Sequence, residues 1–214
     1  MKKFIYVLFI FIYLSFSQDQ KWNFSADGNI EQIKINGETI RKLKQNVRFF
    51  KENQIIITDN AMQNINNDVL HMNGNTMMIN GLDTLTCDSM IYWSKLDSGY
   101  AMGEVNYIQS SPNRKLFSDN FHYWETEGFQ GSSFITKGNS RLQESDLLIS
   151  ADKIYYDDET QIMILEVDAS VNNSQRGIFG DEMIIQYKDS LINDINIISN
   201  ANAYNDIKIK IEKN

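Results

Sequence analysis

The chain has 214 residues, of which 42% are hydrophobic and 22% are charged, so it is long enough to bury a core and is not disordered by composition. Its 28 acidic residues outnumber its 20 basic residues, and the formal net charge of −8 argues against sequence-independent binding to nucleic acid. One cysteine and two histidines exclude a disulfide framework and a structural zinc site built from those residues.

The first residues predict export. Met1-Lys2-Lys3 is a short cationic start, and the apolar run from Phe4 to Phe16 ends beside Ser15 and Ser17, which suit a cleavage site. A membrane-spanning helix would need about 20 apolar residues. We therefore expect residues 1–17 to be a cleaved signal peptide, with an uncleaved membrane anchor as the alternative.

The rest of the chain is predicted to be a single β-domain over residues 18–200, followed by a C-terminal edge strand or tail over 201–214. A single proline and 12% aromatic residues favour strands over long helices. Ile33 to Ile40 predicts a hairpin, because Asn36-Gly37 suits a type I′ turn. The alternating stretch from Ile207 to Ile211 is typical of an edge strand that places lysine on one face.

One short pattern recurs along the domain. It reads apolar, any, small, Asp, any, apolar, often followed by Tyr, and its copies are roughly 30 residues apart. They are centred on Asp59, Asp88, Asp119, Asp152 and Asp181. A looser signal for a polar turn lies between the copies, at Gln45-Asn46-Val47, Gly74-Asn75-Thr76, Gly103-Glu104-Val105, Gly131-Ser132-Ser133 and Ala169-Ser170-Val171. Two strands per unit predict about ten strands in a stack, with more at the ends.

The repeat also predicts a bend. The apolar residue three positions before the Asp and the one two positions after it would face opposite sides of a flat strand. Both reach one core only if the strand bends or bulges at the small residue and the Asp. We therefore expect kinks at Cys87-Asp88, Ser118-Asp119, Ala151-Asp152 and Gly180-Asp181.

These features together resemble the OstA-like family, also called the LptA or organic-solvent-tolerance family. The stretch from Ile40 to Phe49, followed by Ile55 to Ala61, is similar to the family's opening unit, and the resemblance covers about residues 30–200. It implies an all-β fold, a β-jellyroll of stacked antiparallel strands that is open at its ends.

The resemblance also implies a function. It suggests a periplasmic lipid-binding carrier that shields the acyl chains of lipopolysaccharide and helps to pass it from the inner to the outer membrane within a transenvelope bridge. The implied partners are lipopolysaccharide, an inner-membrane ATP-driven extractor complex, an outer-membrane translocon and further copies joined end to end. The chain itself has no phosphate-binding Gly-x-x-x-x-Gly-Lys-Ser/Thr loop.

The apolar positions of the repeat are the candidate lipid-binding residues. They could line a groove, or they could fill a closed core. The set is Phe49, Ile57, Leu85, Met90, Leu116, Phe121, Ile149, Ile154, Ile178 and Met183. The repeat tyrosines Tyr92, Tyr123 and Tyr156 could place a polar tip at the rim or pack across strands.

No catalytic residue, metal site or cofactor is predicted. His71 and His122 are far apart in sequence and are read as isolated surface residues, and Cys87 takes the small position of its repeat. A calcium ladder or a glycosidase pair needs several oxygens at one point, whereas each unit supplies mainly one Asp. The alternatives to a soluble carrier are a membrane-anchored jellyroll of the same transport path and an exported structural β-helix.

Overall fold

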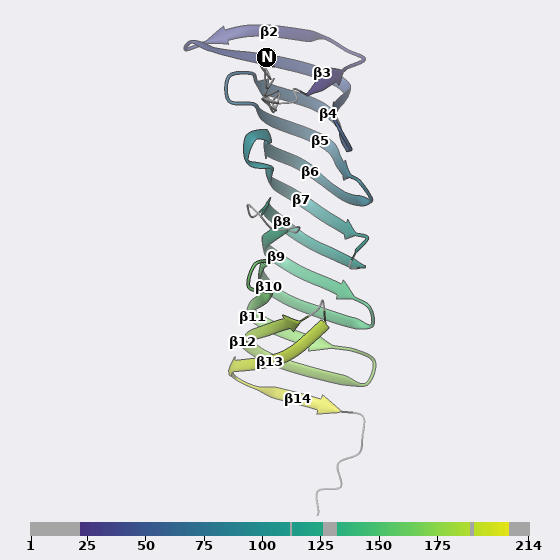
Figure 1. The fold of residues 1–214 in the computed structure, drawn as a ribbon, viewed down its shortest axis with the longest axis vertical. Helices are drawn as coiled ribbons and strands as arrows, with labels where there is room; N and C mark the ends of the chain where they lie inside the picture. The colour runs from purple at the N-terminus through teal and green to yellow at the C-terminus, as the bar shows by residue number, and fades with distance from the viewer. Residues whose placement is uncertain (1–21, 112, 126–131, 189–190, 206–214) are drawn as a thin grey trace, which may run out of the picture.

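The computed structural model describes residues 22–111, 113–125, 132–188 and 191–205, which form one antiparallel sheet (Figure 1). The predicted signal peptide and the predicted strand from Ile207 to Ile211 lie outside these residues. The strands are β1 (Asn23–Ser25), β2 (Ile30–Ile35), β3 (Glu38–Lys51), β4 (Gln54–Asn64), β5 (Val69–Asn80), β6 (Asp83–Trp93), β7 (Ser98–Gln109), β8 (Arg114–Glu125), β9 (Ser132–Glu144), β10 (Leu147–Asp157), β11 (Ile162–Asn172), β12 (Arg176–Lys188), β13 (Leu191–Ser199) and β14 (Asn202–Asn205). A single 3₁₀ turn, Ser94–Leu96, follows β6.

The strands stack in chain order. From β3 to β12 each strand pairs with the next, while β1 and β2 both pair with β3, and β13 and β14 both pair with β12. All of these pairings are antiparallel, so the predicted all-β stack of antiparallel strands is confirmed and the β-helix alternative is wrong. The predicted hairpin is also confirmed, since Asn36 and Gly37 have φ of 50° and 84° between β2 and β3.

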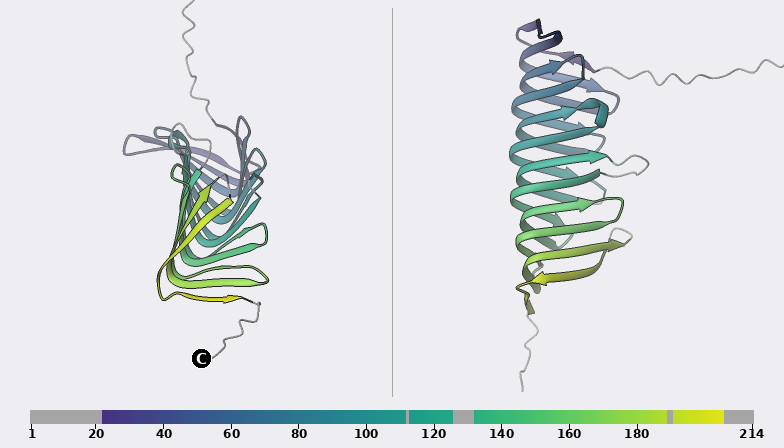
Figure 2. Two further views of the ribbon diagram at one scale, coloured as in Figure 1. Left: turned by 60° about the horizontal axis from the view of Figure 1, so that its bottom comes forward. Right: turned by 90° about the vertical axis from the view of Figure 1, so that its left-hand side faces the viewer.

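The sheet is folded lengthwise into two arms (Figure 2). Each long strand bends near its middle, and the bends of successive strands lie one above another; we call this row the corner line. The first arm carries the halves of β4, β6, β8, β10 and β12 that precede the repeat Asp, together with the strand halves that pair with them. The second arm carries the other halves. Backbone pairing among the described strands runs only between neighbours in the stack, so the two arms face each other through side chains.

The corner line lies at the predicted kinks. The pairing register shifts between Thr86 and Ser89 in β6, between Phe117 and Asn120 in β8, and between Ser150 and Lys153 in β10. In β12 the register with β11 passes from Gly180 to Glu182 and skips Asp181. Leu85 and Met90, on either side of one kink, are both buried. The four predicted kinks are therefore confirmed.

On the neighbouring strand, most corners contain two consecutive residues with left-handed backbone conformation, that is, with positive φ. Gly74 and Asn75 have φ of 84° and 44°, and the Asn75 side-chain amide donates a hydrogen bond of 2.8 Å to Asp59. Asn139 donates in the same way to Asp119 over 2.9 Å. Asp59 and Asp119 thus cap a backbone conformation that favours Gly and Asn, which explains why the two sequence signals alternate in these units.

The sequence predicts these corners as polar turns, and three points of that prediction need correction. They are corners inside continuous strands, whereas turns between strands were expected. In β9 the corner lies at Gly138-Asn139, so the expected Gly131-Ser132-Ser133 is wrong, and in β11 it lies at Val167-Asp168, two residues before the expected Ala169. The unit that contains β8 and β9 is longer than its neighbours. The spacing of the earlier corners therefore points to Gly131, seven residues before the glycine that forms the corner.

A sixth copy of the repeat escaped the sequence reading. Asp27, in Ala26-Asp27-Gly28, accepts a 2.9 Å hydrogen bond from the side chain of Asn46, whose φ is 48°. β1 and β2 are therefore the two halves of one bent strand, as are β13 and β14 around Asn200. The weak apolar character of Ile30 to Ile35, which is mostly exposed, concealed this copy.

We expect Gly103→Ala to lower the free energy of unfolding by about 3 kcal/mol, because the change combines a left-handed backbone with a steric conflict. Gly103 has φ of 73°, and an added Cβ would lie 2.2 Å from Oδ2 of Asp88. Gly37→Ala is the matched control, since Gly37 has φ of 84° but nothing within 4 Å, and should cost only about 1 kcal/mol. Urea unfolding of the two variants measures both values, and equal costs would contradict the close packing of Asp88 on Gly103.

Candidate functional site

The inner faces of the two arms form one continuous apolar cluster. It runs from Trp22 at one end of the stack to Tyr187 near the other. The alternation of side chains along each strand turns every second residue inward, and the kink resets that alternation at the corner. The apolar interior therefore extends along the length of the sheet.

The structure places most of the predicted lipid-binding residues in this cluster. Phe49, Leu85, Met90, Leu116, Phe121, Ile149, Ile154 and Met183 belong to it and are at most 4% exposed. Ile178 packs half-buried against its edge. Ile57 faces away from the interior, because Ile56 is the residue three positions before Asp59 and takes the inner position, where it is fully buried. Applying the repeat strictly would have selected Ile56.

Aromatic rings join the two arms across the interior. Phe121 of the second arm stacks on Tyr107 of the first arm with ring centroids 5.3 Å apart. It also lies 5.6 Å from the ring of Phe134, which continues to Tyr156 at 5.4 Å. Of these contacts only the stack of Phe121 on Tyr107 joins the two arms, because Phe134 and Tyr156 belong to the second arm, as Phe121 does.

The repeat tyrosines combine the two roles considered for them. The ring of Tyr92 is fully buried, while its hydroxyl donates hydrogen bonds to Asp97 and to Gln54 on the opposite arm. The hydroxyl of Tyr123 donates to the sulfur of Met78 over 3.2 Å, again between arms. Burial raises the pKa of both phenols. Their rings therefore pack inside, and their hydroxyls contact residues of the opposite arm.

We call the side where the strands of the two arms end, away from the corner line, the mouth. A group that we call the Arg114 cluster lies there and consists of Arg114, Glu144, Tyr156 and Tyr187. Arg114 Nε lies 3.2 Å from one carboxylate oxygen of Glu144, and Nη2 donates to the other over 3.3 Å. The Arg114 guanidinium lies 5.2 Å and 5.1 Å from the ring centres of Tyr156 and Tyr187 on the opposite arm. Tyr187 also donates a 3.2 Å hydrogen bond to Glu144.

The charges of the Arg114 cluster are held within a largely apolar interior. Among the described side chains, Arg114 is the only charged one that is fully buried, with 6% exposed. Burial alone would lower the pKa of Arg114, but Glu144 and the neighbouring phenols raise it above its ordinary value. Burial, followed by the negative charge of Glu144, raises the pKa of Tyr187. The cluster is therefore an ion pair of Arg114 and Glu144, with the neutral phenol of Tyr187 beside it.

Sequence reasoning missed this cluster. Arg114 lies two positions before the inner residue Leu116, and Glu144 lies two positions after the inner residue Leu142, so strand alternation alone places both facing inward. The register pairs them directly across β8 and β9. A search for charged residues on the inner face of the predicted strands would have found them.

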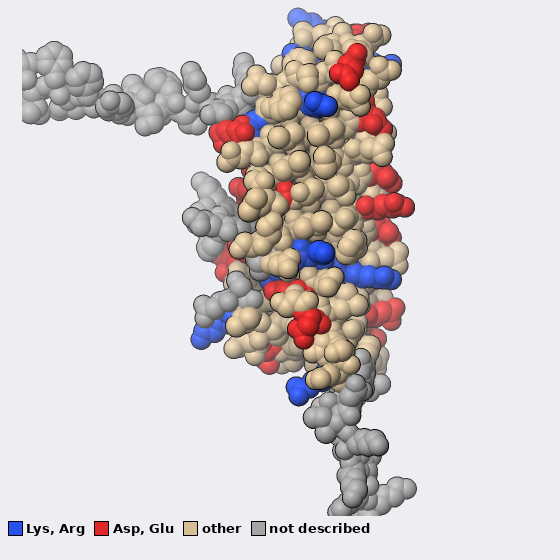
Figure 3. Space-filling model, turned by 90° about the vertical axis from the view of Figure 1, so that its right-hand side faces the viewer, with Lys and Arg blue, Asp and Glu red and all other residues tan. Residues whose placement is uncertain are grey.

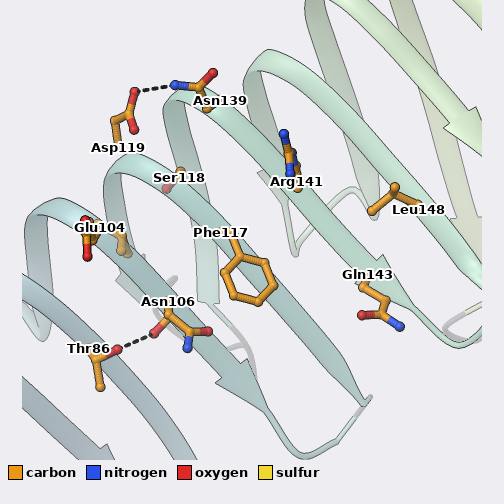
Figure 4. A pocket seen from close by; sticks show the side chains of 11 residues that line it. Thr86, Glu104, Asn106, Phe117, Ser118, Asp119, Asn139, Arg141, Gln143 and Leu148 are labelled. Atoms are coloured by element: carbon orange, nitrogen blue, oxygen red, sulfur yellow. Dashed lines mark hydrogen bonds between the residues drawn. The ribbon is translucent and has the colours of Figure 1, made fainter.

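The outer surface carries acidic residues and an open hollow. Acidic side chains gather along one edge of the molecule (Figure 3). Among the described residues no group of three or more His, Cys, Asp or Glu side chains could hold a metal ion. The hollow lies on the first arm, where Asn106, Phe117 and Arg141 form a row across three strands (Figure 4). Most of its lining residues are polar or charged, whereas the inner face is a continuous apolar surface.

The two histidines differ in their surroundings. His71 is exposed, as expected. His122 is half-buried, with its ring centroid 5.4 Å from that of Trp124 and its Nε2 3.2 Å from the hydroxyl of Ser98, so the expectation of an isolated surface residue is wrong here. Burial lowers the pKa of His122.

The thiol of Cys87 is expected to resist labelling in the folded protein. Cys87 is buried beside the kink, and burial raises its pKa from 9.0 to about 12. At pH 8 the folded chain should therefore hold about 1000-fold less thiolate than the unfolded chain, so reaction with a chromogenic disulfide should be slow until urea is added. Its contribution to stability should be complete below pH 9 and fall as the pH rises toward 12. Rapid labelling without urea would contradict the packed position.

None of the described residues forms a helix long and apolar enough to cross a membrane. The sequence matches no protein-family model and no curated protein. Among solved structures, the chain is similar to LptH from Pseudomonas aeruginosa, the LptA-homologous periplasmic component of its conserved lipopolysaccharide transport device. The identity is 9%, the match covers 82% of each chain, and the TM-score is 0.21.

Proposed function

We propose that the protein is an exported carrier that shields the acyl chains of lipopolysaccharide between the two arms of its sheet and helps to pass the lipid from the inner to the outer membrane. The observation that carries this proposal is the apolar inner face, which is continuous along a sheet folded only once. The cargo and the direction come from the resemblance of the repeats to the OstA-like family.

The energetics of an acyl chain explain why such an interior is useful. Each CH₂ removed from water stabilises the bound state by about 0.8 kcal/mol, so a chain of a dozen carbons gains roughly 10 kcal/mol. A lipid in a continuous apolar interior avoids that penalty at every step along the stack. Flexible side chains such as Met90 and Met183 suit contents that change, because the thioether chain adopts many shapes.

Uptake of a lipid requires the arms to separate. In the described state the inner side chains pack on one another, as Phe121 does on Tyr107. The arms share no strand pairing with each other, and the strands of each arm keep their own backbone hydrogen bonds when the corner angle widens. An acyl chain would then replace side-chain contacts with contacts of the same apolar kind.

The ends of the stack suit passage between carriers. β2 pairs only with β3, and β13 only with β12, among the described strands, so each end presents a strand edge. Ile30 and Ile35 of β2 are about half exposed. Such edges accept a strand from another chain. They would let further copies, or the inner- and outer-membrane partners, extend the apolar interior.

Photo-crosslinking tests the proposal. A photoreactive residue at position 90, 121 or 154, each on the inner face, is expected to form an adduct with lipopolysaccharide in cells. Position 117 is the matched control, because Phe117 lies on the same strand as Phe121 but is 43% exposed on the outer face. Circular dichroism of each variant verifies that the sheet is formed. Absence of adducts from all three inner positions in folded protein would contradict the proposal.

A further inference from the structure

The Arg114 cluster has the arrangement of an anion-binding site, and the carboxylate of Glu144 is the anion that occupies it. Two kinds of donor converge on the carboxylate of Glu144, namely the guanidinium of Arg114 and the hydroxyl of Tyr187. They come from opposite arms, since Arg114 begins β8 and Tyr187 ends β12. The carboxylate therefore occupies the point between the arms that an external anion would take.

Donor capacity remains at this point. Arg114 Nε is buried and makes no hydrogen bond, although it lies 3.2 Å from Glu144. The guanidinium lies 5.2 Å and 5.1 Å from the centres of the two tyrosine rings, which attract its charge and help to hold it in place. Arginine presents several N–H groups in a planar fork that fits the oxygens of a phosphate or carboxylate.

The position of the cluster relates it to the apolar interior. Leu116, two residues beyond Arg114 on the same strand face, is fully buried in the core. The Glu144 side chain is 12% exposed, so water reaches the cluster on the carboxylate side. A chain lying among the inner side chains would thus bring a polar group attached to its end to Arg114.

We propose that the Arg114 cluster binds the anionic headgroup, a phosphate or carboxylate, of the lipid whose acyl chains lie between the arms, with Glu144 swinging out to solvent as the anion arrives. This inference rests on the proposed function and adds the class of headgroup to it. The exchange keeps the buried charge of Arg114 paired at each stage, which avoids the large cost of an isolated buried ion.

Two lipids with the same chain test the inference. Lauroyl lysophosphatidate and monolauroylglycerol differ only in the phosphate, and their dissociation constants are measured by calorimetry below their micellar concentrations. We expect the wild type to bind the phosphate lipid about tenfold more tightly, which is the size of a charge-assisted hydrogen bond. In the double variant Arg114→Gln, Glu144→Gln the ratio of the two constants should fall to about one. This variant removes both charges together, so that no unpaired charge remains buried.

The outer pair Lys153–Glu166 supplies the control. Its side chains are 36% and 44% exposed, and the double variant Lys153→Gln, Glu166→Gln should keep the wild-type ratio. A ratio of one in the wild type would overturn the inference and leave the carrier function standing, whereas failure of both lipids to bind would overturn the carrier function. Binding of inorganic phosphate alone at Arg114, with no preference between the lipids, would also overturn the headgroup assignment.

Discussion

Replacement of Phe121 by alanine is expected to lower the free energy of unfolding by about 4 kcal/mol. The Phe121 side chain is 2% exposed and lies at the centre of the interior, where its ring contacts Tyr107 of the opposite arm as well as Tyr123 and Phe134 of its own. Alanine would remove these ring contacts and leave a cavity that rigid sheets cannot fill by collapse. Urea unfolding followed by tryptophan fluorescence measures the change.

Phe117 provides the internal comparison for this variant. It lies on β8, one kink away from Phe121, but on the outer face, where it is 43% exposed. Phe117→Ala should cost less than about 1 kcal/mol, since much of its surface already contacts water. If both variants lost the same stability, the assignment of inner and outer faces across the kink would be wrong.

Glu144→Gln is expected to lower the free energy of unfolding by about 3 kcal/mol at neutral pH. The substitution keeps the shape of the side chain but leaves the buried guanidinium of Arg114 without a counter-charge. It also weakens the hydrogen bond that Tyr187 donates from the opposite arm. The loss should appear as a lower urea midpoint, with the slope of the unfolding transition unchanged.

The other described ion pair calibrates this result. Glu166 lies 2.6 Å from Lys153 across β10 and β11, but both side chains are well exposed. Glu166→Gln should change the free energy of unfolding by no more than about 0.5 kcal/mol, as is usual for solvated pairs. Equal effects of the two substitutions would mean that Arg114 is hydrated in solution and that the mouth between the arms stands open.

The repeat predicts much of the architecture from the sequence alone. The opposite parity of Leu85 and Met90 around Asp88 sufficed to predict a bend, because strand alternation leaves no other way to bury both. The hairpin at Asn36-Gly37 followed from backbone preferences alone. Eight of the ten predicted site residues share one core for the same reason of periodicity.

Long-range placement could not be read in this way. Periodicity says which face a residue occupies, but it does not say that Arg114 of one arm lies beneath Tyr156 and Tyr187 of the other. The corner at Gly138-Asn139 was missed because the unit containing it is longer, so spacing pointed to Gly131. The bend at Asp27 was missed because the strand after it buries little, and the sequence signal of burial was weak.

The stacking of bent strands along the corner line makes the height of the molecule depend on the number of strands. Several corners carry an Asp cap, such as Asp59 with Asn75, and each bent strand forms backbone pairs only with the strands above and below it. Adding or deleting one pair of bent strands would change the height by about 10 Å and leave the pattern of backbone pairing in the remaining layers unchanged. Chains of this design could therefore be matched to gaps of different width by duplication of a single module.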